Sequence, residues 1–405
     1  MLTEELEAPS GADAAVSGAG RVGVTRLVLT DFRNYKEARL KLGLEPVVVT
    51  GPNGAGKTNL LEAVSLLAPG RGLRQARLGD LDRREGGSDG RAWAVFAALQ
   101  TGRGELRIGT GREAGKEAKG VLRAAAGERR VVRIDGETAK SQAALGERLA
   151  VNWLTPVMDR LFLEGPGERR RFLDRLVLAL DPSHASRVVA YGEALRERSR
   201  LLRERRQDKA WLLALEETMS REGVAVAAAR REAVERLDRL CADCEGPFPK
   251  ARLALEGAVE DWLAQMPALA AEEAFAAALS ANRSGDAESG GAATGPHRSD
   301  LSVRDERTGL AAGLASTGEQ KALLIAILLA HARLVSEIRG EPPLILFDEI
   351  AAHLDESRRR ALFAALLRLP GQVWVSGTEK ALFAPLREGA QFLAVSGGVL
   401  GGDHP

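Results

Sequence analysis

The residues best suited to chemistry form a glycine-rich stretch that ends in a lysine and a threonine, Gly51-Pro52-Asn53-Gly54-Ala55-Gly56-Lys57-Thr58. The apolar run Val47–Val49 precedes it and apolar residues at helical spacing follow it, which predicts a strand, a P-loop and a helix. Glycines let backbone N–H groups surround phosphate oxygens, and the lysine supplies charge for the β- and γ-phosphates. The Thr58 hydroxyl can ligate Mg²⁺. A plain glycine turn is the alternative, and the flanking pattern favours a nucleotide site.

A second apolar run, Pro343–Phe347, ends in two adjacent carboxylates. A carboxylate at the mouth of a parallel strand beside a P-loop can hold Mg²⁺ through water, which is the role that we predict for Asp348. Glu349 points in a different direction and can orient and deprotonate the attacking water. We therefore predict catalytic roles for Glu349, Asp348 and Lys57. A strand that simply ends in an Asp-Glu turn is common and is the alternative interpretation.

The sequence Ser316-Thr317-Gly318-Glu319 opens a helix that is apolar nearly all round, expected over Gly318–Ile338. Ser316 is well suited to cap that helix. The same helix start presents N–H groups and a hydroxyl that can bind a phosphate. Because the P-loop already holds the phosphates of its own subunit, we predict that these four residues contact the nucleotide of another subunit.

The overall composition is that of a soluble, globular chain. Its 405 residues are 45% hydrophobic and 28% charged, and they can form one to three domains. The formal net charge of +1 gives no global basic field, so any nucleic-acid surface must be local. Two cysteines, no apolar run long enough to cross a bilayer and no signal peptide favour a cytoplasmic location. Residues 1–20 contain few large apolar side chains, and we expect them to be disordered.

The expected elements change character along the chain. Residues 74–155 alternate short strands with glycine-rich breaks, whereas residues 167–244 are typical of amphipathic helices. Leu40–Val49 is expected to be one strand that leads into the P-loop. Four helices are expected within the helical block, over Arg171–Leu180, Ala185–Arg206, Trp211–Met219 and Gly223–Leu240. Asn282–Pro296 has the composition of a flexible connector.

Together, the P-loop, the Ser-x-Gly-Glu helix start and the apolar strand ending in Asp-Glu resemble the head of an ABC-type ATPase. Within that superfamily the chain resembles the RecF family most closely. The matching blocks, in RecF order, are Thr30–Tyr35, Gly51–Leu61, Leu163–Pro166 with Arg169–Asp174, and Gly295–Leu301. Rad50 and SMC proteins insert long heptad coiled coils between the P-loop and the signature, whereas this chain has room only for an arm of short helices.

The resemblance implies an α/β fold, an ABC-type P-loop ATPase head of two lobes with an inserted α-helical arm. Residues 1–20 would be a disordered N-terminal extension. Residues 21–155 would form the first part of the head, with the P-loop, and residues 156–283 the arm. Residues 284–401 would complete the head with the signature and the Asp-Glu strand.

The resemblance also implies a function. Members of the family bind ATP, dimerise around it, bind DNA at gaps or stalled forks and help to load the recombinase with RecO- and RecR-type accessory proteins. We expect the same here, with ATP and Mg²⁺ as ligands, with gapped, single-stranded or duplex DNA and a second copy of the chain as partners, and with no membrane. ATP hydrolysis to ADP and phosphate would be weak and would reset the dimer.

The resemblance assigns further residues to the implied nucleotide site. The P-loop contacts would extend to Asn59, and Arg33 and Asn34 would lie near the edge of the nucleotide. Mg²⁺ would be held by Thr58 and, through water, by Asp348. His353 and Asp355 follow the Asp-Glu pair in a D-loop, which in such dimers lies near the partner, and Asp355 would also cap the next helix.

Two features of the sequence depart from related patterns. ABC transporters carry a histidine after the Asp-Glu strand that contacts the γ-phosphate, whereas this chain has Val375-Ser376-Gly377-Thr378. We therefore expect slow hydrolysis. RecF proteins usually have an acidic residue directly after the proline that corresponds to Pro156, whereas here the acidic residue is Asp159.

Three adjacent arginines, Arg169, Arg170 and Arg171, are possible DNA contacts, and a solvated helix face is the alternative. Two other classes of function compete with a DNA-binding ATPase. The missing histidine and the helical arm count against a transporter-type ATPase subunit. The Ser-x-Gly-Glu element and the Asp-Glu pair count against a P-loop kinase or GTPase, because neither element is needed there.

Overall fold

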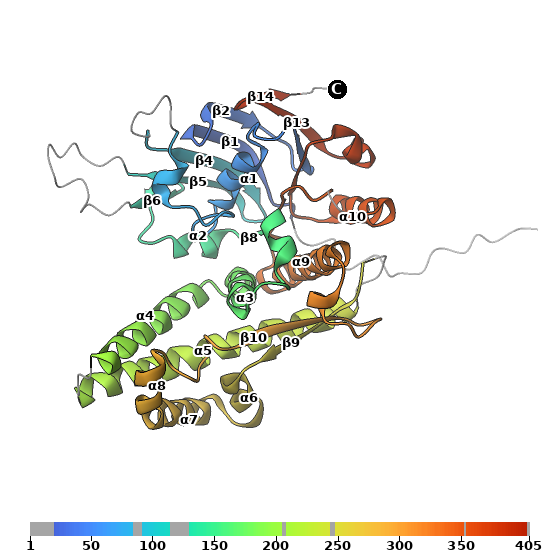
Figure 1. Cartoon of the computed structure of the whole chain (residues 1–405). Coiled ribbons are helices and arrows are strands. Elements are labelled where there is room, and N and C mark those ends of the chain that lie inside the picture. Colours follow the sequence, from blue (N-terminus) through green and yellow to red (C-terminus); the bar gives the residue numbers. More distant parts are fainter. Residues whose placement is uncertain are drawn as a thin grey trace, which may run out of the picture.

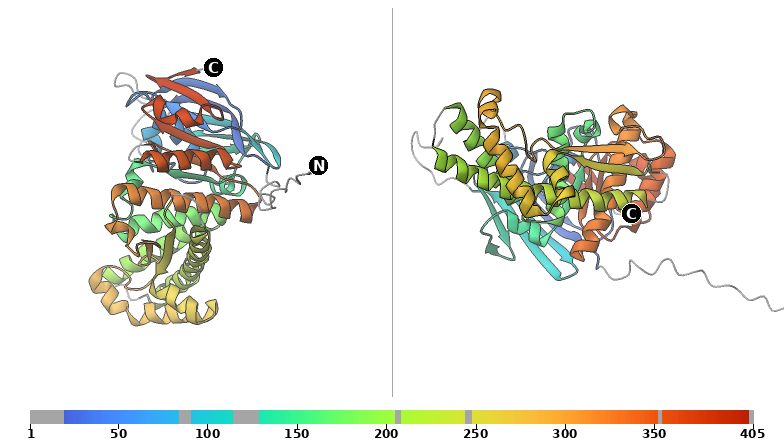
Figure 2. Two further views of the ribbon diagram at one scale, coloured as in Figure 1. Left: turned by 90° about the vertical axis from the view of Figure 1, so that its right-hand side faces the viewer. Right: turned by 90° about the horizontal axis from the view of Figure 1, so that it is seen from below.

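A computed structural model describes residues 20–83, 91–113, 129–204, 208–243, 248–351 and 354–402. A head built around two β-sheets lies at the top of Figure 1, and a mainly helical arm lies below it. Sequence segments before and after the arm combine to form the head. Helix α9, Thr317–Arg339, lies between the head sheets and the arm in the views of Figures 1 and 2. This arrangement is the expected α/β head with an inserted helical arm.

The sheet that carries the P-loop is mainly parallel and has the strand order β14-β13-β3-β12-β11-β8. Its strands are β3 (Val47–Thr50), β8 (Val151–Leu154), β11 (Leu344–Phe347), β12 (Val373–Gly377), β13 (Gln391–Ser396) and β14 (Val399–Gly402). Only β14 pairs in the antiparallel direction. Every residue of β3, β8 and β11 is buried, as expected for short apolar strands in a sheet that is covered on both faces.

The two faces of this sheet contribute to different parts of the core. Val47 and Val49 belong to the cluster that contains the apolar side chains of α1, Lys57–Ser65. Val48, between them, packs with the side chains of α9 and of α10, Glu356–Arg368. Because successive side chains of a strand point to opposite faces, β3 connects the two clusters and fixes the position of the P-loop that follows it.

A second, antiparallel sheet packs on the α1 side in the order β2-β1-β4-β5-β6-β7. Its strands are β1 (Gly23–Phe32), β2 (Tyr35–Lys41), β4 (Ala94–Thr101), β5 (Gly104–Arg112), β6 (Arg130–Ile134) and β7 (Glu137–Thr138). The prediction of a single strand over Leu40–Val49 is wrong. β2 ends at Lys41 and β3 begins at Val47, and the chain passes from one sheet to the other through Gly43 and Pro46, a proline that cannot donate to a sheet ladder.

In the described part of the chain, the arm consists of six helices and one pair of strands. The helices are α3 (Pro166–Leu180), α4 (His184–Arg203), α5 (Lys209–Ala242), α6 (Ala258–Gln265), α7 (Ala268–Ala281) and α8 (Arg283–Ser289). The paired strands are β9 (Ala251–Glu256) and β10 (Asp300–Asp305). The two helices predicted over Trp211–Met219 and Gly223–Leu240 are one helix, α5. A Cβ at Gly223 would lie 2.8 Å from Phe275 and 3.1 Å from Tyr191. This glycine therefore allows close packing, and burial of the helix overrides its tendency to interrupt one.

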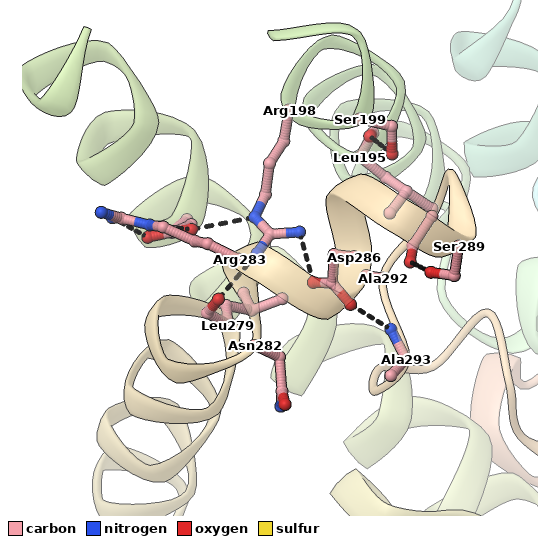
Figure 3. A network of polar contacts seen from close by, with 12 residues as sticks. Leu195, Arg198, Ser199, Leu279, Asn282, Arg283, Asp286, Ser289, Ala292 and Ala293 are labelled. Carbon is pink, nitrogen blue, oxygen red and sulfur yellow. Dashed lines mark hydrogen bonds and ion pairs between the residues drawn. The ribbon is translucent and has the colours of Figure 1, made fainter. Parts of the chain in front are cut away.

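The prediction of a flexible connector over Asn282–Pro296 is also wrong. The segment contains α8, and its Asp286 side chain is 2% exposed. The Asp286 carboxylate accepts a 2.7 Å hydrogen bond from Arg198, which lies between Asp286 and Leu279 in Figure 3. Arg198 also donates to Glu216 at 2.9 Å and to the Leu279 carbonyl at 2.6 Å. The polar, glycine-rich composition of the segment therefore does not indicate that a buried guanidinium holds one of its carboxylates in place.

Helix α9 is buried along almost its whole length, which confirms the helix predicted over Gly318–Ile338. The remaining helices are α2 (Ala143–Arg148) and the 3-10 helices η1 (Leu78–Leu81), η3 (Pro156–Arg160), η4 (Ala312–Leu314) and η5 (Lys380–Leu386). The domain boundary expected between residues 283 and 284 stays a prediction. Elements α8 and β10 follow that boundary in the sequence, and both pack with elements of the arm. None of the described helices is long and apolar enough to span a bilayer.

Candidate nucleotide site

The P-loop connects β3 to α1 through glycines with positive φ angles, at Gly51, Gly54 and Gly56. A Cβ at Gly51 would lie 2.2 Å from the carbonyl oxygen of Val395, so no other residue fits the turn without movement. The Lys57 ammonium donates to the Gly51 carbonyl at 2.8 Å. No side chain of the described residues caps the start of α1, so its first N–H groups can bind an anion.

Thr58 and Asp348 meet directly, although they are far apart in the sequence. The Thr58 hydroxyl lies 3.0 Å from both carboxylate oxygens of Asp348. Ser376 on β12 donates to Asp348 at 2.7 Å and accepts from the Glu349 N–H at 3.0 Å, which fixes the orientation of the pair. A hydroxyl and a carboxylate are oxygen donors of the kind that Mg²⁺ prefers, so this pair fits the predicted metal role.

Glu349 lies beside the P-loop lysine. Its carboxylate oxygen Oε1 is 3.3 Å from the Lys57 ammonium. The backbone of Glu349 has a φ angle of 51°, a conformation that is uncommon for residues other than glycine. Such conformations recur at functional sites, where the surrounding structure holds them. The backbone thus aims this carboxylate toward the phosphate side of the P-loop, whereas Asp348 faces Thr58.

The turn after β1 packs against the P-loop, as the resemblance implies for Arg33 and Asn34. Asn34 donates to the Ala55 carbonyl at 2.9 Å and accepts from Asn59 at 2.7 Å. Tyr35, which the sequence analysis did not single out, donates to the Gly56 carbonyl at 3.0 Å. These bonds hold the turn close to the expected nucleotide.

Arg33 is held by an acid on the P-loop helix. Its guanidinium makes two 2.8 Å hydrogen bonds to Glu62 of α1, and a third to the Asp80 carbonyl. Glu62 is completely buried and was missed by the sequence analysis, because it occupies an apolar-facing position of an amphipathic helix. A carboxylate that is buried next to the P-loop indicates part of the site only when its arginine partner is known.

The signature residues begin α9 as a reciprocal cap. The Ser316 hydroxyl accepts from the Glu319 N–H at 3.4 Å, and the Glu319 carboxylate accepts from the Ser316 N–H at 2.9 Å. Hydrogen bonds from Ser316 lower the pKa of Glu319 below its ordinary value. Ser316 and Thr317 are exposed, and no hydrogen bond or ion pair in the described part of the chain joins residues 316–319 to the P-loop. The structure therefore does not bring the two predicted phosphate sites together within one chain.

The residues after Glu349 are only partly described. Asp355 caps α10 by accepting from the Arg358 N–H at 2.8 Å, as predicted. His353 lies outside the described residues. Thr378, at the position where transporters have a histidine, is exposed after β12.

A buried lysine, missed by the sequence analysis, connects the signature helix to the Asp-Glu pair. Lys321 of α9 lies 3.4 Å from the Asp159 carboxylate and donates to the Glu349 carbonyl at 3.2 Å. Burial lowers the pKa of Lys321, and the Asp159 charge opposes that effect. The Lys321 side chain thus links Asp159, three residues after Pro156, to the backbone of Glu349.

The three arginines considered as DNA contacts are used mainly within the chain. Arg169 makes two 2.7 Å hydrogen bonds to Asp300, and Arg170 donates to the Ser299 carbonyl at 2.7 Å. Arg171 pairs with a glutamate one turn earlier on α3 and is exposed. A DNA contact by these residues therefore stays a prediction, and the internal bonds of the first two favour a role in joining α3 to β10.

The described residues contain no group of three or more histidine, cysteine, aspartate or glutamate side chains that could hold a metal by themselves. Together, the P-loop, the Asp-Glu pair and the capped signature helix define a P-loop ATPase head of the ABC type. A family model described as the RecF/RecN/SMC N-terminal domain matches residues 23–395. The chain belongs to the RecF family.

Relatives align along nearly the whole chain. The chain is 47% identical over 380 residues to the DNA replication and repair protein RecF of Rhizobium johnstonii, which covers 93% of this chain and 98% of that protein. It is 47% identical over 389 residues to the protein of the same name from Brucella suis, with 94% and 97% covered. The solved structure of the recombination mediator protein RecF-ATPrS in the RecFOR pathway shares the fold, with a TM-score of 0.81, 20% identity and coverage of 96% and 100%.

Proposed function

We propose that the chain is an ATP-dependent DNA-binding protein of recombinational repair and of replication-gap or stalled-fork processing. ATP and Mg²⁺ bind at the P-loop, two copies close around the nucleotide, and the dimer holds DNA. Slow hydrolysis resets the dimer, and RecO- and RecR-type proteins assist it in recombinase loading. The proposal is supported by 47% identity to relatives named DNA replication and repair protein RecF and by the fold shared with a solved RecF-ATP structure.

The separation of the two phosphate-binding helix starts carries the proposal of a dimer. The P-loop can surround the phosphates from one side only, and the start of α9 offers a second set of N–H groups with an exposed Ser316 hydroxyl. These groups make no contact with the P-loop of their own chain in the part that the structure describes. A second copy, placed face to face, satisfies both sites with one nucleotide.

The surface beside Ser316 supports this arrangement, because it is apolar. The side chains of Val157, Leu163 and Leu314 are 83%, 52% and 74% exposed. The segments that carry them are adjacent, since a Cβ at Gly313 would lie 2.8 Å from the carbonyl oxygen next to Leu163. Large apolar side chains gathered at one exposed site are typical of a surface that a partner covers.

The chemistry that we propose is simple hydrolysis. Lys57 and the start of α1 hold the phosphates, and Thr58 with Asp348 would hold Mg²⁺, which neutralises phosphate charge when it is bound. The Glu349 carboxylate, oriented by its backbone and by Lys57, accepts the proton of the attacking water. Thr378 offers the γ-phosphate only a neutral hydroxyl where transporters have a histidine, so hydrolysis is slow. A transporter subunit, the alternative, is disfavoured by membership of the RecF family.

The dimer is tested by the molar mass in solution. With Glu349→Gln, ATP should persist, and light scattering should show the mass doubling when ATP and Mg²⁺ are added. Ser316→Arg is the matched variant, because its large side chain blocks the second phosphate site and leaves the P-loop intact. It should bind ATP and remain a monomer. A monomer mass for Glu349→Gln with ATP bound would overturn the proposed dimer.

DNA binding is tested separately with Lys57→Ala. Loss of a charged hydrogen-bond donor to the phosphates should weaken ATP binding about 10- to 100-fold and abolish ATP-stimulated retention of gapped or duplex DNA. The control is Lys36→Ala, which removes an exposed lysine of β2. Retention by Lys57→Ala equal to that of the unmodified protein would remove the ATP-gated part of the proposal.

A further inference from the structure

A cavity of about 1080 Å³ lies at the β6 edge of the antiparallel sheet, away from the P-loop. Among the described residues that line it, six have basic side chains and one, Glu113, has an acidic side chain. The basic residues are Arg71, Arg77, Arg129, Arg130, Arg133 and Lys140. We refer to this cavity as the β6 pocket. On a chain whose formal net charge is +1, it is a strong local concentration of positive charge.

The arginine at the base of the β6 pocket is fixed in place. Arg130 is buried, donates to the Thr110 hydroxyl at 2.8 Å and to the Gly70 carbonyl at 2.6 Å, and also donates to the Leu66 carbonyl. The two carbonyls follow the end of α1, so the guanidinium stabilises the carboxyl end of the helix that begins at the P-loop. Burial lowers the pKa of Arg130 to about 10, and the side chain is still charged at neutral pH.

The other five basic side chains are exposed and form no ion pair with any residue that the structure describes. They come from separate parts of the chain, the loop after α1, the strand β6 and the segment before α2. An alternative explanation is that these cations only protect the edge of the sheet from aggregation, but such cations would lie on β6 itself. This explanation does not account for Arg71 and Arg77, which reach the same cavity from a loop.

The geometry points to an extended polyanion as the ligand. Arg129 and Arg133, both exposed, are four residues apart around β6, which is about 13 Å along a strand. One DNA strand presents a phosphate about every 3.4 Å of helix axis, so this length corresponds to about four phosphates. We propose that the β6 pocket binds the phosphodiester backbone of DNA. The inference rests on the proposed function and assigns DNA contact to a different region from the arginines of α3.

The test compares two triple variants with equal charge changes. Arg77→Gln, Arg133→Gln and Lys140→Gln remove three exposed cations of the β6 pocket. The control removes three exposed cations from β1 and β2, the two strands on the far side of the same sheet, through the substitutions Arg26→Gln, Lys36→Gln and Lys41→Gln. The binding of a DNA duplex is titrated with ATP present over a range of salt concentrations, and ATP binding is measured in parallel.

The pocket variant should bind ATP normally and lose about 100-fold in DNA affinity near physiological salt, and its logarithmic salt slope should fall by nearly three. The control variant should keep most of the affinity. Unchanged affinity and slope in the pocket variant, or an equal loss in the control, would overturn the inference while the proposed function stands. If the unmodified protein binds no DNA with ATP, the proposed function and the inference both fail.

Discussion

The arginines of the arm and those of the β6 pocket have opposite surroundings. In the arm, Arg169 pairs with Asp300, and Arg198 pairs with Asp286, while β10 and α8 supply the acids. In the β6 pocket, five exposed basic side chains line one cavity, and Glu113 is the single acid among its described lining residues. The same residue type therefore stabilises the fold in one region and remains available to a partner in the other.

The difference shows that adjacency in the sequence is a poor guide to a charged surface. Arg169, Arg170 and Arg171 are consecutive, but a helix turns by about 100° per residue, so the three side chains diverge toward different partners. Arg71 and Arg133 are far apart in the sequence, yet the fold places them in one cavity. Whether a basic cluster can bind DNA depends on the acids that the fold brings to it.

The largest expected effect is in the arm. Arg198→Ala should lower the free energy of unfolding by about 3–5 kcal/mol, because it leaves the buried Asp286 carboxylate without its cation and leaves the buried Glu216 with Arg283 alone. Denaturant unfolding measures this change. Arg200→Ala, two residues later on α4 and exposed, is the matched control and should leave the transition midpoint unchanged. A loss below about 1 kcal/mol for Arg198→Ala would contradict the role assigned to the arm arginines.

A buried histidine with no acidic partner among the described residues allows a test by pH. His331 of α9 bonds to Asn152 at 2.8 Å and to the Leu176 carbonyl at 2.9 Å, and burial lowers its pKa from 6.5 to about 4. As the pH falls, His331 is therefore protonated in the unfolded chain before it is protonated in the folded chain. Stability should be complete above pH 6.5 and decrease by on the order of 3 kcal/mol toward pH 4.

This pH dependence is measured by denaturant unfolding across pH 4 to 8, with the variant His331→Gln beside the unmodified protein. The variant is less stable throughout, but its stability should change less with pH, because the titrating group is gone. An equally steep dependence in both proteins would show that other groups cause it.

A smaller effect is expected at the junction of α3 and β10. Arg169→Ala should cost about 1–2 kcal/mol, because its two charge-assisted bonds to Asp300 are partly exposed to solvent. Arg171→Ala, the control on the same helix, should not change stability measurably. If Arg169→Ala instead keeps full stability and weakens DNA binding, the triplet is a binding surface after all.

The smallest effect on stability is expected in the β6 pocket. The triple variant with Arg77→Gln, Arg133→Gln and Lys140→Gln should remain within about 0.5 kcal/mol of the unmodified protein, because none of the three side chains makes an ion pair with the described residues. Thermal unfolding checks this directly. A loss of several kcal/mol would mean that these cations are structural and would remove the contrast with the arm.

The sequence predicted which residues meet at the centre of the candidate nucleotide site, because that motif is local. Lys57 and Thr58 come from one motif, and the apolar run before Asp348 and Glu349 already indicates a parallel strand that ends there. Parallel strands place their carboxyl ends at one edge of a sheet, so the observed contact between Thr58 and Asp348 follows from that topology.

The parts that were missed depend on long-range packing. Tyr35, Glu62 and Lys321 are ordinary residues of a strand or a helix in the sequence, and only the folded chain places them beside the P-loop or the Asp-Glu pair. Gly223 was read as a helix boundary because its role, close contact with Phe275, involves a helix that is distant in the sequence. Local patterns cannot report such contacts.

The position of β3 has a consequence for the synthesis of the chain. Both neighbours of the P-loop strand, β12 and β13, come from residues 373–396. A growing chain on the ribosome therefore carries the P-loop sequence long before it has a folded loop that could hold ATP. Until residue 396 has been translated, β3 lacks a complete set of neighbouring strands, so the loop that follows it has no finished sheet to hold its shape.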